Sequence, residues 1–395
     1  MGYYHSYLNS AREILDQYGE EKVGLQSRQP FSSFLKKYFA QHKKHGSNDR
    51  KQISHLCYCF FRLGKLSPDL SVEEKILAGL FLCSNKPNNI LSELKPEWNA
   101  QVEQSAKEKL LTLDHSLRID EIFPWRKELS NGIEYGQFCE SFFIQPDLFL
   151  RLRPGSESIV KEKLLASGIS FSQMNSACLR LPNNSKVENF IALDKEAVVQ
   201  DYSSQQIKEY LKIAGENLRS PMSVWDCCAA SGGKSLLLYD TNQKISLTVS
   251  DIRESILANL KKRFENAGIK KYKEFIAELA KPFSSQKLFD LIVCDAPCTG
   301  SGTWSRTPEQ LYFFNEKKIE EYSSLQKKIV SNITPSLKQN GHLLYVTCSV
   351  FKSENEEVVN YVRNELDLEL AKMETLIGYD KKADTMFAAL FKKVL

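Results

Sequence analysis

Apolar residues in the first third of the chain recur at helical spacing. From residue 1 to about 125, apolar and polar positions follow the period of amphipathic helices, each with one face suited to a core. The helices expected from this pattern are Ala11–Tyr18, Phe31–Phe39, Asp49–Leu63 and Glu73–Leu82. We therefore predict an all-α domain over residues 1–128.

The pattern changes over residues 129–215. DLFLRLRPGS is typical of a strand and a turn, and IVKEKLLASGI is typical of a helix that ends at Gly168. Two further short strands are expected in NSACLRLP and NFIAL. A strand, a helix and two strands in this order predict a small α+β module.

From residue 216 to 395, short apolar runs alternate with amphipathic helices. The expected strands are Ser223–Cys228, Ser246–Ser250, Phe289–Asp295, His342–Thr347 and the late run TMFAALFKK. The expected helices are Lys234–Tyr239, Ser255–Asn266, Glu316–Leu337 and Ser353–Glu365. Because strands alternate with helices, the pattern predicts an α/β fold with a doubly wound, mostly parallel sheet.

Composition excludes several classes of protein. With 42% hydrophobic residues the 395-residue chain has ample material for packed cores, so wholesale disorder is excluded. A net charge of +4 is compatible with a nucleic-acid partner without demanding one. No apolar run reaches membrane-spanning length, and the start lacks the pattern of a secretion signal. The 10 cysteines include no C-x-x-C pair, which disfavours zinc ribbons and suggests a reducing cytoplasm.

Two cysteines point to chemistry at the rim of the predicted sheet. Cys298 in DAPCTGSG and Cys348 in YVTCSV each follow an apolar run that is typical of a buried strand. The carboxyl ends of such strands line the ligand crevice of an open α/β sheet, so both thiols and Asp295 are expected there. A helix beginning near Ser353 and the ammonium of Lys234 favour the thiolate form of Cys348, which is the nucleophilic form. For three other thiols a structural role is the preferred interpretation. Cys294 is expected in the core, and Cys227 and Cys228 are expected in the core or in the wall of the cofactor pocket.

SVWDCCAASGGKS predicts a strand, a glycine turn and a helix. A phosphate-binding P-loop would need a glycine where Cys228 stands, so that interpretation is disfavoured. A turn that binds a nucleoside cofactor fits better, because Asp251 lies 18 residues after Gly233, close to the interval of about 20 seen for ribose-binding acids. Glu278 follows a further candidate strand and is expected either to contact an adenine amine or to be a plain surface residue.

Basic residues have two interpretations that stay open. A phosphate-gripping surface for RNA and an ordinary solvated face are both compatible with their distribution. The candidate RNA-binding residues are Arg151, Arg153, Arg306, Lys43, Lys44 and Arg50.

The motifs resemble those of a known family. QDYSSQQ (200–206), DCCAASGGKS (226–235), SDIR (250–253), DAPCTGSG (295–302) and TCSVFKSENEE (347–357) are similar to successive motifs of the RsmB/NOL1/NSUN/Fmu family of S-adenosylmethionine-dependent RNA 5-methylcytosine methyltransferases. GSNDRKQISHLCYCFFR is similar to the NusB-like RNA-binding domain of the bacterial ribosomal RNA members. Three departures stand out: Ser231 replaces a usual proline, Glu278 a usual aspartate, and GYDKKADTMFAAL a GDGFF-type run.

The resemblance implies a Rossmann-like methyltransferase domain, a reaction and roles for site residues. It implies that Cys348 attacks carbon 6 of cytosine, that Cys298 assists product release and that Asp295 holds the base. Lys234 is implied to lie near both the base and the cofactor. S-adenosylmethionine is the implied cofactor, and RNA, most of all small-subunit ribosomal RNA, is the implied partner. Separately from the resemblance, no metal is expected and the chain is taken as a monomer by default. The implied cofactor-binding residues are Cys228, Ala229, Ala230, Ser231, Gly232, Gly233, Lys234, Asp251, Arg253, Glu278 and Asp295.

Four alternative functions share some of these features. A transfer RNA methyltransferase would show the same motifs. A DNA 5-methylcytosine methyltransferase normally carries an ENV run after its PC motif, and none is present. A catalytically silent RNA-binding protein for ribosome assembly or antitermination is disfavoured because Cys298, Cys348, Asp295 and Lys234 are all present. A metal-dependent hydrolase is disfavoured because the 6 histidines of this chain do not have the spacing of metal ligands.

Overall fold

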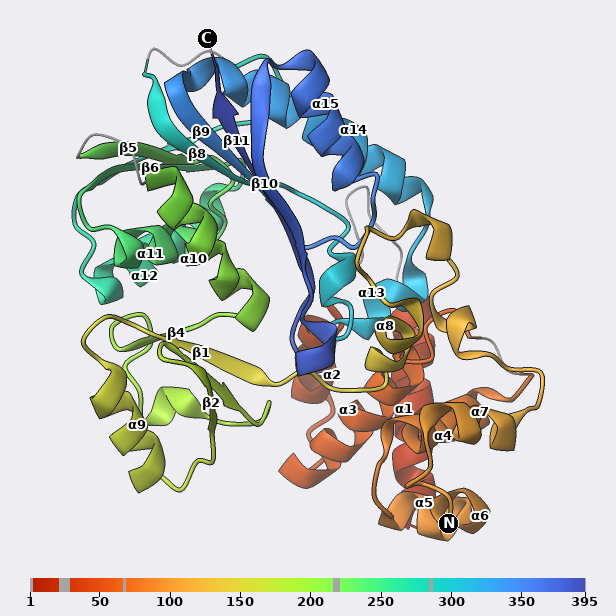
Figure 1. The fold of residues 1–395 in the computed structure, drawn as a ribbon. Helices are drawn as coiled ribbons and strands as arrows, with labels where there is room; N and C mark the ends of the chain where they lie inside the picture. Colours follow the sequence, from red (N-terminus) through yellow and green to blue (C-terminus); the bar gives the residue numbers. More distant parts are fainter. Residues whose placement is uncertain (1–2, 21–28, 67–68, 216–220, 284–286, 395) are drawn as a thin grey trace. The chain divides into compact units, whose positions relative to one another are not determined.

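The computed structural model describes residues 3–20, 29–66, 69–215, 221–283 and 287–394 (Figure 1). Two compact units form. The helical unit comprises Met1–Lys127, Glu134–Gln145 and Trp304–Asn315. The sheet unit comprises Glu128–Ile133, Pro146–Thr303 and Glu316–Leu395. This division differs from the predicted boundaries after residues 128 and 215, because the small module belongs to the same compact unit as the large sheet.

The helical unit confirms the helices expected from the amphipathic pattern. Its elements are α1 (Tyr3–Glu20), α2 (Phe31–Gln41), α3 (Ser47–Phe61), α4 (Val72–Cys83), α5 (Asn89–Leu94), α6 (Pro96–Asn99), α7 (Ala106–Leu113), α8 (Tyr135–Ser141) and α13 (Pro308–Phe313). The distant α13 belongs here because aromatic rings hold it. The ring of Phe313 lies 5.8 Å from that of Tyr18, and the ring of Tyr312 lies 5.5 Å from that of Phe61. Such edge-to-face contacts add to the burial of apolar area.

The small module of the sheet unit is a four-stranded antiparallel sheet in the order β2-β3-β1-β4. Its elements are β1 (Leu148–Leu152), α9 (Glu157–Ala166), β2 (Ser172–Asn175), β3 (Cys178–Leu181) and β4 (Ala197–Val199). The strand predicted in residues 189–193 is wrong: the segment holds the end of a 3-10 helix at Asn189 and a single bridge residue, Leu193, and the strand lies at β4 instead. The apolar residue Ile191 fills the core under α9 from a turn, which Glu196 closes by accepting a hydrogen bond from the backbone N–H of Ala192.

The large sheet has seven strands in the order β10-β11-β9-β8-β5-β6-β7. These are β5 (Met222–Asp226), β6 (Ile245–Asp251), β7 (Tyr272–Ile276), β8 (Phe289–Asp295), β9 (Leu337–Thr347), β10 (Leu368–Leu376) and β11 (Met386–Lys393). β5 to β9 run parallel to one another, and β11 runs antiparallel to both of its neighbours, β9 and β10. The predicted strands and the doubly wound fold are confirmed. β10 was missed because it is a partly exposed edge strand whose charged residues break the apolar pattern.

Helices cover both faces of this sheet (Figure 1). One core cluster joins α10 (Tyr202–Gly215), α11 (Gly233–Thr241) and α12 (Glu254–Ala267) to strand residues such as Val224. The other joins α14 (Lys317–Ile333) and α15 (Glu356–Glu365) to strand residues such as Trp225. Adjacent residues of β5 therefore serve opposite cores, as the two-residue period of a strand requires. The strand order reverses between β5 and β8, which places a crevice beyond their carboxyl ends.

No helix among the described residues is long and apolar enough to cross a bilayer.

Candidate active site

A lysine and an aspartate form the charged centre of the crevice. Asp295 is the last residue of β8, and Lys234 lies in the first turn of α11. The Nζ of Lys234 donates to Oδ2 of Asp295 at 2.5 Å, and the lysine side chain is 10% exposed. Burial alone lowers the pKa of Lys234, but attraction to Asp295 and Cys348 outweighs it, so the pKa lies above its ordinary value. Lys234 therefore stays charged.

The two predicted thiols are neighbours. Cys348 directly follows β9, and Cys298 follows β8 by three residues. A hydrogen bond with Cys348, followed by burial, raises the pKa of Cys298 well above its ordinary value. Because that bond favours the protonated form, Cys298 is a neutral thiol that donates toward Cys348. The pair is thus asymmetric, with a proton donor beside the second thiol.

A buried glutamate ties the two cysteine loops together. Glu354 accepts hydrogen bonds from the backbone N–H of Thr299 at 2.9 Å, from the Ser349 hydroxyl at 2.6 Å and from the Gln326 amide at 3.0 Å. Thr299 follows Cys298, and Ser349 follows Cys348. Burial raises the pKa of Glu354. Sequence reasoning did not single out Glu354, because its place after a strand gave no sign that it turns inward to join two loops.

Gly302 is a second contact between the loops. Its N–H donates to the carbonyl of Cys348 at 2.8 Å, and its own carbonyl accepts from the N–H of Thr385 at 3.0 Å. A Cβ at this position would lie 1.9 Å from the Thr385 carbonyl oxygen. Only glycine permits this approach, so the second glycine after Cys298 is fixed by packing and needs no ligand to explain it.

The glycine turn before α11 is held by an aspartate. Ala230 and Gly232 adopt left-handed conformations, with φ of 45° and 83°. Asp251, at the end of β6, accepts from the N–H of Ala230 and from the N–H of Arg253, each at 3.0 Å. Its carboxylate therefore bridges the turn to the next loop and keeps free lone pairs for a ligand.

Ser231, which departs from the family pattern, is anchored by a neighbour. Nη1 of Arg263 donates to the carbonyl of Ser231 at 3.0 Å and to its hydroxyl at 3.2 Å. Arg263 also pairs with Asp194 of the small module at 2.8 Å. A side-chain hydrogen bond thus restrains this turn where proline would restrain it through its ring.

A cavity of about 570 Å³ opens over these elements. This volume lies within the range of cofactor sites. The predicted cofactor residues that line it are Cys228, Ala230, Asp251, Arg253, Glu278 and Asp295, together with the thiol-bearing Cys298. Ala229, Ser231, Gly232, Gly233 and Lys234 are not on its wall and lie in the turn and helix behind it.

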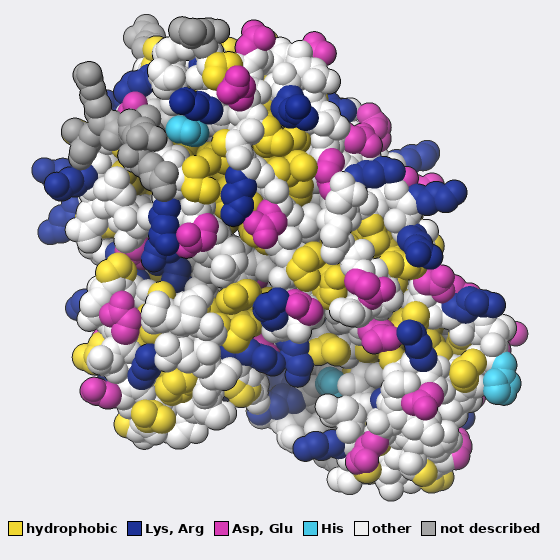
Figure 2. Space-filling model, in the orientation of Figure 1, with side chains coloured by type: hydrophobic (Ala, Val, Ile, Leu, Met, Phe, Trp, Pro, Cys, Tyr) yellow, Lys and Arg dark blue, Asp and Glu magenta, His cyan; other side chains and the backbone are white. Residues whose placement is uncertain are grey.

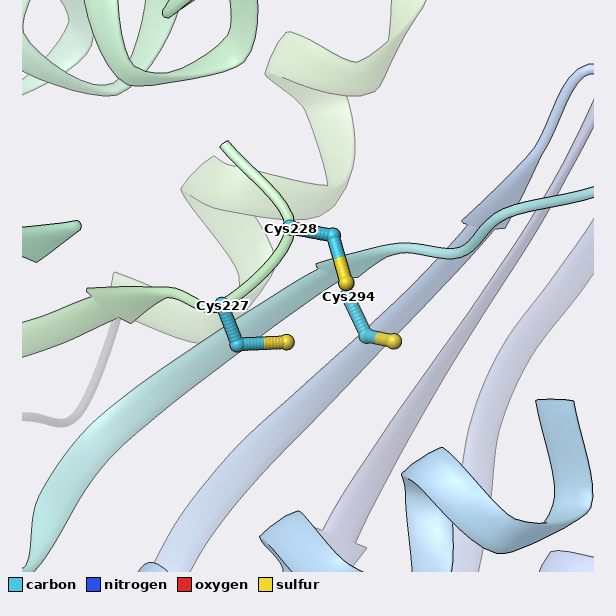
Figure 3. A group of neighbouring side chains, drawn as sticks. All are labelled: Cys227, Cys228 and Cys294. Carbon is cyan, nitrogen blue, oxygen red and sulfur yellow. The ribbon is translucent and has the colours of Figure 1, made fainter. Parts of the chain in front are cut away.

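Asp226 and three thiols lie close to this cavity, and two of the thiols, Cys227 and Cys228, line it. Burial raises the pKa of Asp226 to about 7, against the opposing effect of a hydrogen bond from Ser235 at 2.6 Å. Hydrogen bonds from Cys227 and Cys228 lower the pKa of Cys294 to about 6. The three cysteines are close together in Figure 3. Sequence reasoning gave Asp226 no role and placed the three thiols in the core or a pocket wall; Cys294 and Cys227 are indeed buried.

The candidate RNA-binding residues divide into two groups. Arg151 and Arg153 are buried, and both pair with Asp240, at 2.5 and 2.7 Å. Their prediction as phosphate ligands is therefore wrong, because buried guanidinium groups that already share a carboxylate cannot reach a nucleic acid. They join the small module to α11 instead.

The remaining candidates lie in the helical unit. Lys43 and Lys44 are exposed, whereas Arg306 and Arg50 are half-buried, and Arg50 donates to the carbonyl of His45 at 2.8 Å. Figure 2 shows Lys and Arg side chains spread over the visible face together with Asp and Glu. These four residues stay a prediction.

Solved structures share this fold. The crystal structure of PH0851 has a TM-score of 0.68 at 19% identity and covers 98% of this chain and 99% of its own. A methyltransferase homologue from Pyrococcus horikoshii has a TM-score of 0.59 at 22% identity and covers 73% of this chain and 98% of its own. NSun6 from Pyrococcus horikoshii has a TM-score of 0.57 at 14% identity, with 66% and 94% covered.

Sequence relatives match part of the chain. The ribosomal RNA small subunit methyltransferase B of Photorhabdus laumondii is 33% identical over 187 residues, which are 45% of this chain and 41% of the relative. The protein of that name from Shigella sonnei is 29% identical over 210 residues, which are 51% and 48%. The matched segment thus spans less than half the length of each relative. Residues 216–390 match the model of the family described as 16S rRNA methyltransferase RsmB/F. The resemblance seen in the motifs is thereby confirmed over residues 216–390, which are similar to the methyltransferases of this family.

Proposed function

We propose that this chain methylates carbon 5 of a cytosine in RNA, with S-adenosylmethionine as methyl donor and Cys348 as nucleophile. The observation that supports this most directly is the pairing of a protonated Cys298 with Cys348, beside the Lys234–Asp295 ion pair and next to the cavity. A neutral thiol beside a second cysteine suits a reaction in which the second cysteine adds to the base and the first assists its departure.

The residues have separable tasks. Carbon 5 of cytosine is a poor nucleophile, and addition of the Cys348 thiolate at carbon 6 shifts the electron pair of the ring double bond toward carbon 5. S-adenosylmethionine supplies the electrophilic methyl group that carbon 5 then takes. Loss of the carbon 5 proton to a base restores the double bond as the sulfur–carbon 6 bond breaks. Cys298 would donate a hydrogen bond to the departing thiolate, and Asp295 would hold the polar edge of the base.

The cofactor proposal rests on the lining of the cavity. Asp251 offers free lone pairs beside a left-handed turn, as expected for a ribose site, and Glu278 reaches the same cavity. The structure of NSun6 was determined with SFG, an analogue of S-adenosylmethionine, which supports the same cofactor here.

The substrate proposal is small-subunit ribosomal RNA. It rests on the names of the relatives and on the family description. A base must leave its stack to reach a thiol at the bottom of a crevice, so a loop or single strand is the expected target.

Trapping tests the mechanism. Wild type, Cys298→Ala, Cys348→Ala and the double variant are incubated with S-adenosylmethionine and cellular RNA, with Cys178→Ala as the matched control. We expect a denaturant-stable protein–RNA adduct to accumulate in Cys298→Ala and to be absent from the double variant, because the first thiol then adds and cannot leave. Sequencing the trapped RNA separates ribosomal from transfer RNA. If no variant forms an adduct and wild type transfers no methyl group to RNA, the proposal is refuted.

A further inference from the structure

Three thiols form a compact cluster that the proposed reaction does not use. Cys227 and Cys228 lie in the turn after β5, and Cys294 lies in β8. The three Sγ atoms all lie within 4.8 Å of one another (Figure 3). They are also hydrogen-bonded among themselves, which shows that the side chains face a common space. Cys298 and Cys348 belong to a separate pair.

The spacing matches a thiolate-bound metal ion. A zinc–sulfur bond is about 2.3 Å long, so three thiolates around one ion lie about 4 Å apart. Sulfur atoms that are within 4.8 Å need to move by less than about 1 Å to reach this geometry. A small rotation about each Cα–Cβ bond provides such a movement without a change in the backbone.

The backbone around the cluster is held in place. The N–H of Cys227 donates to the carbonyl of Val293 at 2.9 Å, and the Ser250 hydroxyl donates to the carbonyl of Cys227 at 2.9 Å. These bonds fix the turn after β5 to the strand that carries Cys294. Ligands fixed in this way lose little freedom when an ion binds, which favours binding.

An ion also has a path to the cluster. Cys227 and Cys228 line the 570 Å³ cavity, and Cys294 is buried behind them. Three protein ligands leave a fourth position open toward the cavity, where water completes a tetrahedral set. Soft thiolate ligands select zinc-group ions and Cu(I) over magnesium and calcium.

We propose that Cys227, Cys228 and Cys294 form a binding site for a thiophilic ion of the zinc group, and that its occupancy competes with the cofactor. Binding releases the protons that the thiols carry to solvent as three metal–sulfur bonds form, with no change in oxidation state. The competition rests on the proposed function, since Cys228 lines the cavity assigned to S-adenosylmethionine; the ion site does not depend on it.

Cd²⁺ and Zn²⁺ serve as probes. The reduced, chelator-treated full chain is titrated with Cd²⁺, and thiolate-to-cadmium charge transfer is followed by ultraviolet absorbance, with Zn²⁺ as competitor. We expect Cys294→Ser to weaken binding by more than about 100-fold, because a direct ligand is lost. The double variant Cys298→Ala/Cys348→Ala and the control Cys178→Ala keep the wild-type absorbance. Loss of the signal in the double variant, or its retention in Cys294→Ser, overturns the proposal.

A measurement on wild type removes the dependence on folding of the variants. Under partial denaturation, bound Zn²⁺ should protect Cys227, Cys228 and Cys294 from alkylation, as mapped by mass spectrometry; equal alkylation with and without Zn²⁺ overturns the site. Calorimetry then measures cofactor binding with and without Zn²⁺. Unchanged cofactor affinity with Zn²⁺ bound overturns the competition. Absence of cofactor binding in both conditions refutes the proposed function, while absorbance and alkylation still decide the ion site.

Discussion

Replacing Asp226 with asparagine should change how the stability of the sheet unit depends on pH. Asp226 is fully buried, Ser235 donates to its Oδ2, and its Oδ1 has no hydrogen-bond partner among the described residues. Its pKa of about 7 exceeds the ordinary value of 3.8 because burial penalises the charged form. Between pH 3.8 and about pH 7, the folded protein therefore keeps a proton on the Asp226 carboxyl that the unfolded chain has lost.

The sign and size follow from that difference. Wherever the folded state binds more protons than the unfolded state, stability falls as pH rises. A separation of about 3 pKa units at about 1.4 kcal/mol each gives a loss of about 4 kcal/mol between pH 4 and pH 7. The asparagine side chain in Asp226→Asn does not titrate. Its amide oxygen can still accept from Ser235, but its NH₂ group is left without an acceptor, at a cost of about 1–3 kcal/mol at every pH.

The two stability curves should therefore cross. We expect Asp226→Asn to be less stable than wild type near pH 4 and more stable near pH 8. Urea unfolding is followed at each pH by tryptophan fluorescence, to which Trp225 of the sheet unit contributes, and by circular dichroism. The difference between the two proteins is used, so that the contributions of other titrating groups cancel. A difference that does not vary between pH 4 and pH 8 would refute the high pKa of Asp226.

Three further outcomes are expected. Gly302→Ala should destabilise the sheet unit by about 1–3 kcal/mol in thermal unfolding, because its Cβ would lie 1.9 Å from a backbone carbonyl oxygen. Gly215→Ala is the control and should change the stability little, because a Cβ there meets nothing within 4 Å. Equal effects of the two substitutions would contradict the packing argument. Asp240→Ala should cost about 3–5 kcal/mol by urea unfolding, because two buried guanidinium groups lose their shared partner, and a loss below about 1 kcal/mol would show that the pairs are not desolvated. Asp295→Asn should lower the pKa of Lys234, because burial then meets less opposing attraction; an NMR titration of the lysine that shows no downward shift would contradict this balance.

Local patterns were enough to predict most elements of both units. The amphipathic helices α1 to α4, the parallel strands β5, β6, β8 and β9, and the antiparallel β11 follow from the spacing of apolar residues. The motifs also indicated the family by resemblance. Separately, thiols and a carboxylate at strand ends were expected to meet at one edge of a parallel sheet. The pairing of Lys234 with Asp295 could not be read from either motif alone, since 61 residues separate them.

The sequence by itself determined most of the segments that form helices and strands, and that Cys298, Cys348 and Asp295 stand at or after the ends of buried strands. Tertiary structure alone decided what each polar group faces. The sequence allowed Arg151 and Arg153 to be interpreted as phosphate ligands for RNA, yet both are buried and pair with Asp240. Similarly, α13 follows the DAPCTGSG motif but packs in the helical unit through aromatic contacts. Periodicity reports which face of an element is apolar, whereas partners distant in sequence are chosen by packing and by the need to satisfy buried charge.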